Sequence, residues 1–399
     1  MPTAEPSSTI TAEGDCDGRF EAVRHAFLAN FDRAGDVGAS VAVAVGGEVV
    51  VDLWGGHLDE ARTEPWQRDT LVNVFSTTKT MSCLALLVCA DRGLIDVDAP
   101  VATYWPEFAA AGKEGVLVRH LLSHTAGLSG WDERLAPEDL YDWEKCTSLL
   151  AAQAPWWEPG TRSGYHAVTQ GYLVGEVVRR VTGSTVGRFF ADEIAGPLDA
   201  DVHIGLDPSE DHRVAPLLPV PSLAEQSVAA GPVERDSVAF RTFVNPRLEA
   251  PQSFDAAWRR AEIPAAGGQG NARGVLRAQH AVANGGEFAG VRLLSGATLD
   301  RILDVQAAGR DLVLGIGVTF GIGYGLNSPR APMSPSPRVC YWGGWGGSLV
   351  VNDMDTSMTM AYVMNRMGPG TVGDDRAHTI LDAVYASLGV DWERPGVVG

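Results

Sequence analysis

Ser76 and Lys79 are the first residues in the sequence whose types and spacing could support covalent catalysis. They lie in VFSTTK (residues 74–79), where a short apolar run ends and a long apolar helical pattern begins. Three residues make about one helical turn, so both side chains are expected on one helix face. The lysine amine could take the Ser76 hydroxyl proton, and the helix N-terminus would favour an oxyanion there. Because serine is also a common N-cap, this S-x-x-K pattern needs support from elsewhere in the chain.

Tyr165 is a second candidate for proton transfer. A turn at Pro159-Gly160 delivers it just before a helix expected over residues 168–181. A tyrosine could act as general base and acid if a nearby lysine lowers its pKa. His166, the next residue, is a candidate for lining the same cleft and contacting substrate. The alternative for Tyr165 is a half-buried structural aromatic.

The glycine-rich stretch YWGGWGGS (residues 341–348) is a third candidate. A strand loaded with glycine lets backbone come close to a ligand. Its N–H groups could form half of an oxyanion hole, with the N–H of Ser76 as the other half. The alternative is a glycine bulge or tight turn between two strands.

The elements that must position these residues indicate an α+β fold. Apolar spacing predicts a helix over 20–31, and residues 39–45 and 48–56 form a pair of strands across a Gly-Gly turn. The middle of the chain is rich in helical patterns, beginning at 76–93. Strand patterns and a last helix then return at 312–320, 323–326, 338–342, 348–352, 357–364 and 375–388. This order predicts an antiparallel sheet flanked by the N- and C-terminal helices, with an inserted all-helical domain.

The same patterns divide the chain into three parts. Residues 1–18 are expected to form a flexible tail. Residues 19–70 together with 260–399 would make the α/β domain that contains the sheet. Residues 71–259 would make the helical domain, whose Pro-rich stretch 205–255 is expected to be a long irregular loop and a candidate lid. The active cleft would lie between the two domains.

Four motifs, in chain order, resemble those of the serine β-lactamase and penicillin-binding-protein superfamily. They are the S-x-x-K of residues 76–79, LLSHTAGL at 121–128, the Pro-Gly turn followed by Tyr165, and WGG at 342–344. Within that superfamily the chain is most similar to the class C-like branch and its family VIII carboxylesterases. The resemblance runs from about residue 37 to residue 388. It implies a β-lactamase/transpeptidase-like fold.

The resemblance also implies roles for the matching residues. Ser76 would be the nucleophile, Lys79 would help to deprotonate it, and Tyr165 would shuttle the proton between the nucleophile and the leaving group. The backbone N–H groups of Ser76 and Trp345 would form the oxyanion hole. Three residues in the place of the family's K-T-G triad would contact substrate: Trp342, Gly343 and Gly344.

Two departures from the family pattern indicate the substrate class. Ala167 stands where the Y-x-N motif has asparagine, and Trp342 stands where K-T-G has lysine. In β-lactamases these two groups recognise the amide and the carboxylate of the substrate. Their absence favours a serine carboxylesterase that hydrolyses small esters. The alternatives are an amidase, β-lactamase or D-amino peptidase of the same superfamily, an acyltransferase, and, least supported, a non-catalytic binding member.

Composition and charge limit the other functions. The 399 residues carry a net charge of −19, which argues against nucleic acid and anionic membrane surfaces as partners. No apolar run approaches the ~18 residues of a membrane span, and the N-terminus lacks a signal-like pattern, so a cytoplasmic protein is expected. Five cysteines without C-x-x-C spacing suggest neither a disulfide framework nor a zinc site. His120 and His124 have metal-like spacing but no third ligand, so no metal or cofactor is expected. The oligomeric state is left open.

Overall fold

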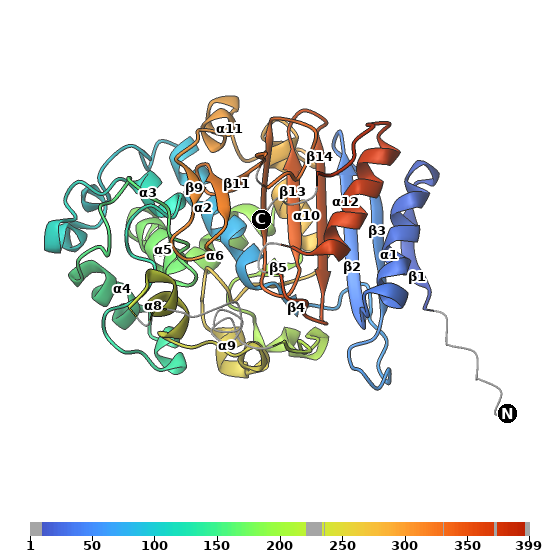
Figure 1. Cartoon of the computed structure of the whole chain (residues 1–399), viewed down its shortest axis with the longest axis horizontal. Helices are drawn as coiled ribbons and strands as arrows, with labels where there is room; N and C mark the ends of the chain where they lie inside the picture. Colours follow the sequence, from blue (N-terminus) through green and yellow to red (C-terminus); the bar gives the residue numbers. More distant parts are fainter. Residues whose placement is uncertain (1–9, 221–233, 235, 330, 371–372, 396–399) are drawn as a thin grey trace.

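Nine antiparallel strands form one sheet, which occupies the middle and right-hand side of the molecule in Figure 1. The computed structural model describes residues 10–395, apart from 221–233, 235, 330 and 371–372. From edge to edge the strands are β1 (Ala12–Cys16), β3 (Glu48–Gly56), β2 (Gly38–Val45), β14 (Met358–Met364), β13 (Leu349–Asp353), β12 (Val339–Gly343), β11 (Gly325–Leu326), β10 (Gly317–Phe320) and β9 (Ala307–Arg310). Two small sheets add β4 (Val72–Asn73), β5 (Val202–His203) and β6 (Gln269–Gly270), and β7 (Glu287–Phe288) with β8 (Val291–Arg292).

Helices surround this sheet on both faces and form the rest of the molecule. The α-helices are α1 (Glu21–Arg33), α2 (Thr78–Asp91), α3 (Val118–Leu122), α4 (Trp143–Ala152), α5 (Thr169–Thr182), α6 (Val186–Phe190), α8 (Val238–Val244), α9 (Ala256–Arg260), α10 (Ala272–Ala283), α11 (Gly296–Ile302) and α12 (Asp375–Ser387). Short 3-10 turns connect several of them. In the part of the chain that the structure describes, none of these helices has the length and apolar character needed to cross a bilayer.

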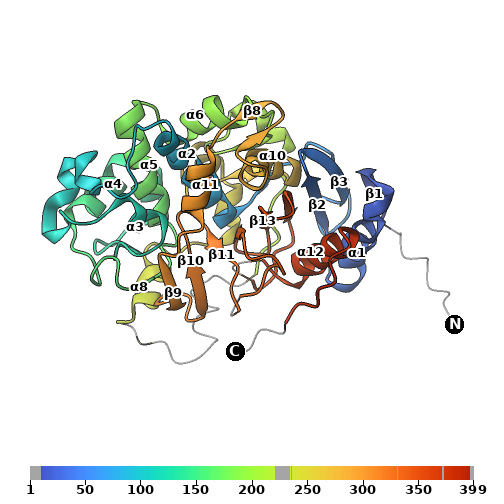
Figure 2. The same ribbon diagram turned by 90° about the horizontal axis from the view of Figure 1, so that it is seen from above.

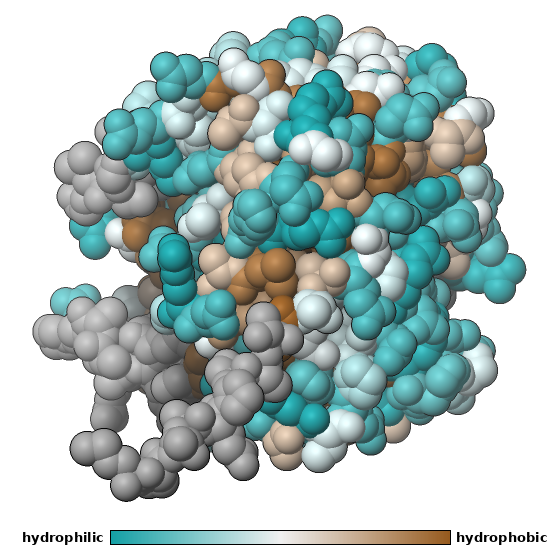
Figure 3. Space-filling model, turned by 90° about the vertical axis from the view of Figure 1, so that its right-hand side faces the viewer, coloured by the Kyte–Doolittle hydropathy of each residue, from teal (hydrophilic) through white to brown (hydrophobic). Residues whose placement is uncertain are grey.

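The two terminal helices cover one face of the sheet. Figures 1 and 2 show α1 and α12 side by side over the strands, with α10 on the opposite face. Strand β2 contributes buried side chains to both faces of the sheet. Val41 and Val43 pack in the core beneath the terminal helices, whereas Ala42 and Ala44 pack in the core on the opposite face. The alternation of valine and alanine along β2 therefore matches the two different cores on which successive side chains pack. The right-hand side of the molecule in Figure 1, where β1 lies, is largely hydrophilic, with small scattered hydrophobic areas (Figure 3).

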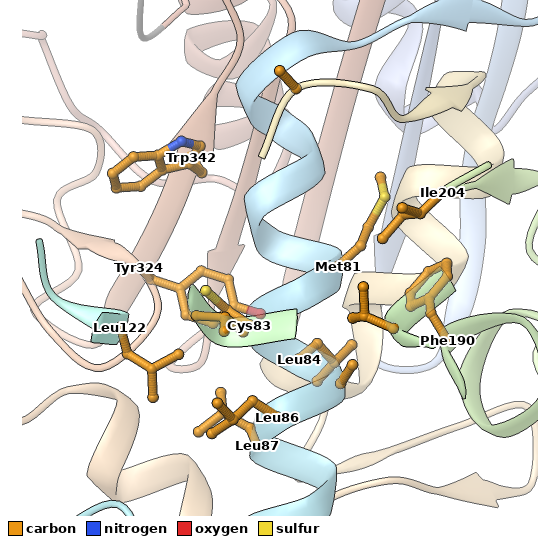
Figure 4. Packing of buried hydrophobic residues seen from close by; sticks show 14 of the residues in the cluster. Met81, Cys83, Leu84, Leu86, Leu87, Leu122, Phe190, Ile204, Tyr324 and Trp342 are labelled. Atoms are coloured by element: carbon orange, nitrogen blue, oxygen red, sulfur yellow. The ribbon is translucent and has the colours of Figure 1, made fainter. Parts of the chain in front are cut away.

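Helix α2 runs through the core between the sheet and the helical part. Its residues from Thr78 to Cys89 are all buried, as expected for a helix that is apolar all round. Figure 4 shows Cys83 and Tyr324 packed on one side of α2, and Met81 and Ile204 on another. The N-terminus of this rigid helix is where VFSTTK lies.

The predicted fold class is confirmed, but three local predictions are wrong. Residues 12–16, expected in a flexible tail, form β1 and pair along their full length with β3. The strand expected over 312–320 is a hairpin, because residues 311–316 turn the chain between β9 and β10. The stretch 205–255 is less irregular than expected and contains α8, while residues 221–233 and 235 lie outside the described residues. The division into two domains remains a prediction.

Candidate active site

The turn that carries Ser76 is held in a strained backbone conformation. Ser76 lies in a 3-10 turn (Phe75–Thr77) directly before α2. Phe75 has a φ of +41°, which is unfavourable for a bulky residue and is typical of functional turns. Two hydrogen bonds hold the turn, from Phe75 N to Asn73 Oδ1 at 3.1 Å and from Val74 N to Gly268 O at 2.9 Å. This turn therefore presents the Ser76 hydroxyl at the helix N-terminus.

Lys79 lies one turn into α2 and reaches back to Ser76. Its Nζ is 3.2 Å from Ser76 Oγ, 2.7 Å from Ala167 O and 2.9 Å from Ala265 O. Burial lowers the pKa of Lys79 well below its usual value. A neutral amine has two N–H bonds and one lone pair. Because the two carbonyl oxygens can only accept hydrogen bonds, the lone pair is left for the Ser76 hydroxyl.

Tyr165 completes the contact on the other side of Ser76. Its hydroxyl donates to Ser76 Oγ at 2.5 Å, and the Lys79 amine lies 4.8 Å from the centre of its ring. Burial raises the pKa of Tyr165, the hydrogen bond to Ser76 partly offsets this, and the Asp311 carboxylate raises it further. The lowered pKa that the sequence analysis required for Tyr165 as a base is therefore not present. Tyr165 is a protonated donor, and Lys79 is the better candidate base.

The glycine-rich stretch after β12 forms a tight turn against the Ser76 turn. Gly344 N donates to Ser348 O, and Gly347 N donates to Gly344 O. Ser348 Oγ lies 3.0 Å from Thr77 Oγ1 and donates to the Val74 carbonyl. A Cβ atom added to Gly344 would lie 2.2 Å from Val74 O, so only glycine allows this approach. The two turns therefore form one rigid unit.

Two backbone N–H groups in this unit have no acceptor. Among the described residues, neither Ser76 N nor Trp345 N donates a hydrogen bond to the protein. The Trp345 ring packs on the Phe75 ring at 5.0 Å, which links the two peptide groups. These are the two N–H groups that the sequence analysis assigned to the oxyanion hole. Their free state is what an oxyanion hole requires.

Trp342 is the last residue but one of β12 and lies beside α2 (Figure 4). Its ring stacks on His124 at 5.2 Å and packs against Tyr165 and Phe320 at 5.9 and 5.6 Å. Its Nε1 is buried and has no hydrogen-bond partner among the described residues. The position that the family pattern assigns to a lysine is thus occupied by an uncharged aromatic group. Gly343 and Gly344 continue from it toward the Ser76 turn.

A contact of His166 with substrate stays a prediction, and the structure shows what else its ring does. The ring is fully buried, its Nδ1 donates to Gly164 O at 2.7 Å, and its Nε2 accepts from Leu128 N at 3.1 Å. Burial lowers the pKa of His166 to about 3, so the ring is neutral. Both ring nitrogens are occupied, and His166 holds the loop that carries Tyr165.

Asp311 and Ser348 contact the site, but the sequence patterns assigned neither of them a role there. Ser348 ends the glycine-rich stretch and was visible there, although its role as a clamp between two turns required the fold. Asp311 Oδ1 accepts from Tyr165 N at 3.0 Å. It lies 146 residues from Tyr165 and belongs to no recognisable motif, so no local signal could have identified it.

A cavity of about 550 Å³ lies elsewhere and does not include any of these residues. It is lined largely by arginines and small residues near β5 and α10. Two of its arginines are paired with carboxylates: Arg213 contacts Asp201 at 2.8 Å, and Arg273 contacts Asp52, outside the lining, at 3.1 Å. Among the described residues, no three His, Cys, Asp or Glu side chains group as metal ligands would. The chemistry is therefore concentrated at Ser76.

Residues 27–385 match the Beta-lactamase family model. The chain belongs to the beta-lactamase family. Esterase/beta-lactamase LipL of Mycobacterium tuberculosis is 37% identical over 375 residues, which cover 91% of this chain and 85% of that protein. This beta-lactamase family chain is also similar to the crystal structure of a family VIII carboxylesterase, with 44% identity, a TM-score of 0.87 and coverage of 94% and 100% of the two chains. A penicillin-binding protein homologue from Caulobacter crescentus is 39% identical, with a TM-score of 0.85 and coverage of 94% and 100%.

Proposed function

We propose that this chain is a serine carboxylesterase that hydrolyses small, uncharged esters through an acyl-Ser76 intermediate. The observation that carries the proposal is the position of Ser76 Oγ, 3.2 Å from the Lys79 amine and 2.5 Å from the Tyr165 hydroxyl. A nucleophile between a neutral base and a protonated donor has what acyl transfer needs. The family VIII carboxylesterase structure and the relative named an esterase/beta-lactamase support the same reaction class.

Acylation would begin when Ser76 Oγ attacks the ester carbonyl carbon and its proton passes to the Lys79 amine. The N–H groups of Ser76 and Trp345 would stabilise the resulting oxyanion, each by roughly 3–4 kcal/mol. The carbon–oxygen bond to the alcohol then breaks, and Tyr165 gives its proton to the leaving oxygen. The proton held by Lys79 restores Tyr165.

Deacylation would repeat these steps with water in place of Ser76. Water loses a proton to Lys79, its oxygen attacks the acyl carbon, and Ser76 Oγ leaves with a proton from Tyr165. The acid is released and the site returns to its starting protonation. An alcohol in place of water would give acyl transfer, which product analysis with added alcohols would detect.

The residues around Ser76 favour an ester over a β-lactam. Trp342 supplies no charge for a substrate carboxylate, and it packs against other aromatic rings. Ala167 offers only a methyl group, and its carbonyl is occupied by Lys79. Beta-lactam hydrolysis is the second candidate, because one relative is named an esterase/beta-lactamase.

The test compares short-chain p-nitrophenyl esters with nitrocefin as substrates. We expect ester hydrolysis to exceed nitrocefin hydrolysis, and Ser76→Ala to abolish both. Ser253→Ala is the matched control, because it also removes a buried serine hydroxyl, one that donates to Ala250 O away from Ser76, and it should leave both activities unchanged. Ester turnover that survives Ser76→Ala would reject the proposal, and faster nitrocefin turnover would reverse the order of the two candidates.

A cytoplasmic location is likewise proposed, and fractionation of cells that express the chain tests it.

A further inference from the structure

The turn between β9 and β10 is clamped onto the loop that carries Tyr165. Asp311 Oδ1 accepts from Tyr165 N at 3.0 Å, and Leu312 N donates to Ser163 O at 3.0 Å. Strand β9 is the far edge of the nine-stranded sheet, whereas Tyr165 precedes α5 in the helical part. The contact therefore joins two regions that are distant in sequence at the residue that donates to Ser76.

Asp311 is built into this contact as a buried carboxylate. Its side chain is 1% exposed, and Oδ1 also accepts from Val313 N at 2.8 Å and Leu314 N at 2.9 Å. Those two bonds are local and are typical of an aspartate that begins a turn. The hydrogen bond from Tyr165 N is the third that Asp311 Oδ1 accepts, and it comes from outside the turn. Oδ2 is buried with no partner among the described residues, which is costly for an acidic side chain.

The backbone around Tyr165 is held at successive N–H groups. Gly164 N donates to His124 O at 3.0 Å, Tyr165 N to Asp311, and His166 N to His124 Nδ1 at 3.1 Å. Two residues later, Ala167 O accepts from the Lys79 amine. Of these bonds, the one to Asp311 acts on Tyr165 itself. A fixed backbone matters because a displacement of about 1 Å in a reacting group costs roughly 100-fold in rate.

We propose that Asp311 is a positioning residue for the reaction at Ser76, fixing the Tyr165 backbone so that its hydroxyl reaches Ser76 Oγ. This inference rests on the proposed function. The alternative is that Asp311 only caps the hairpin turn and contributes to stability. The two possibilities differ in whether the third hydrogen bond matters for the rate.

The test uses two substitutions that separate the local bonds from the bond to Tyr165. Asp311→Ser keeps a hydroxyl that can cap Val313 N and Leu314 N but is too short to reach Tyr165 N as well. Asp311→Asn keeps an oxygen at the Oδ1 position and all three bonds. The matched control is Asp353→Ser, because buried Asp353 accepts from Asp355 N and Thr356 N at the opposite end of β13 from Ser348.

For each variant, kcat and KM for a p-nitrophenyl ester, the melting temperature, and the rate of Ser76 labelling by a fluorophosphonate are measured. We expect Asp311→Ser to lower kcat and the labelling rate by about 100-fold, with KM little changed. Asp311→Asn should restore most of both rates. Asp353→Ser should lower the melting temperature but leave kcat unchanged.

Asp311→Ser that keeps the wild-type kcat and labelling rate would overturn the inference. So would activity losses in Asp311→Ser and Asp353→Ser that simply follow their losses of stability. If Asp311→Ser does not fold, an Asp311→Asn variant that folds but labels as poorly as Ser76→Ala would also contradict it. A wild-type protein that labels but hydrolyses no ester would reject the proposed function alone, because the relative labelling rates still report on Asp311.

Discussion

The Lys79 amine lies 3.2 Å from Ser76 Oγ, and its other two polar contacts are backbone carbonyl oxygens. These carbonyls belong to Ala167 and Ala265, which are 88 and 186 residues away in the sequence. The arrangement orients a buried amine without placing a counter-ion beside it. Burial can then lower its pKa, which keeps the amine neutral and able to accept a proton.

Tyr165→Phe should lower kcat/KM about as much as Ser76→Ala, because the two hydroxyls act in one proton-transfer unit. Losses on the order of 10⁶-fold, which leave essentially no turnover, are expected for each, and the double variant should be little worse than either single one. The measurement is ester hydrolysis by the two single variants and the double variant.

The control for Tyr165→Phe is Tyr385→Phe on α12. The Tyr385 hydroxyl is also buried, donates to Asp353 Oδ2 at 2.8 Å and lies 2.6 Å from Ser334 Oγ. Its removal should cost about 1 kcal/mol of stability and leave kcat unchanged. Additive losses in the Ser76 and Tyr165 double variant would contradict the shared unit.

The pH profile should reflect the opposite pKa shifts of Lys79 and Tyr165. Burial lowers the pKa of Lys79 and raises that of Tyr165, so neutral Lys79 and protonated Tyr165 coexist over a wide pH range. As pH rises through the lowered pKa of Lys79, kcat/KM should rise, and it should then stay level to about pH 10. A fall in kcat/KM between pH 7 and 9 in stable protein would show that one of these two protonation states is wrong.

Gly344→Ala should displace the turn that carries the Trp345 N–H. The new Cβ would lie 2.2 Å from Val74 O and 2.3 Å from Ser348 Oγ, so the two turns must separate. We expect kcat to fall by about 10²- to 10³-fold, as when one oxyanion-hole donor is lost. Ester kinetics together with the melting temperature test this.

Gly296→Ala is the matched control, because a Cβ there meets no atom within 4 Å and the residue begins α11. That variant should keep its activity and be at least as stable as wild type. If Gly344→Ala keeps full activity, the turn after β12 does not contribute the second oxyanion donor.

His166→Ala should destabilise the protein without weakening substrate binding. It leaves a cavity and removes the acceptor of Leu128 N, which together cost about 2–4 kcal/mol. KM should change little, because both ring nitrogens are already bonded to the protein. Thermal denaturation and KM for a p-nitrophenyl ester are the measurements. A large rise in KM at unchanged stability would support His166 as a substrate contact.

Much of the fold could be predicted because its determinants are local. The helical pattern after Ser76 and the alternating residues of β2 reflect the periods of helix and strand, and both appear at nearly the expected bounds. Residues 12–16 were missed because AEGDC has no strand-like alternation, and only pairing with β3 makes it a strand. The apolar residues of 311–316 suggest a strand, but hydrogen bonds to the Asp311 side chain fold these residues into a tight turn, which the apolar pattern does not reveal.

The sequence by itself determined the candidate nucleophile, the lysine one turn away and the tyrosine that follows a Pro-Gly turn, because these signals depend on residue type and short spacing. The tertiary structure alone decided the directions in which the pKa values of Lys79 and Tyr165 shift. Burial makes Lys79 a base and keeps Tyr165 a donor, and burial is a property of neighbours far away in the chain. It also decided that His166 holds the Leu128 backbone and that Asp311 holds Tyr165, because hydrogen-bond partners 38 and 146 residues apart meet only when the chain is folded.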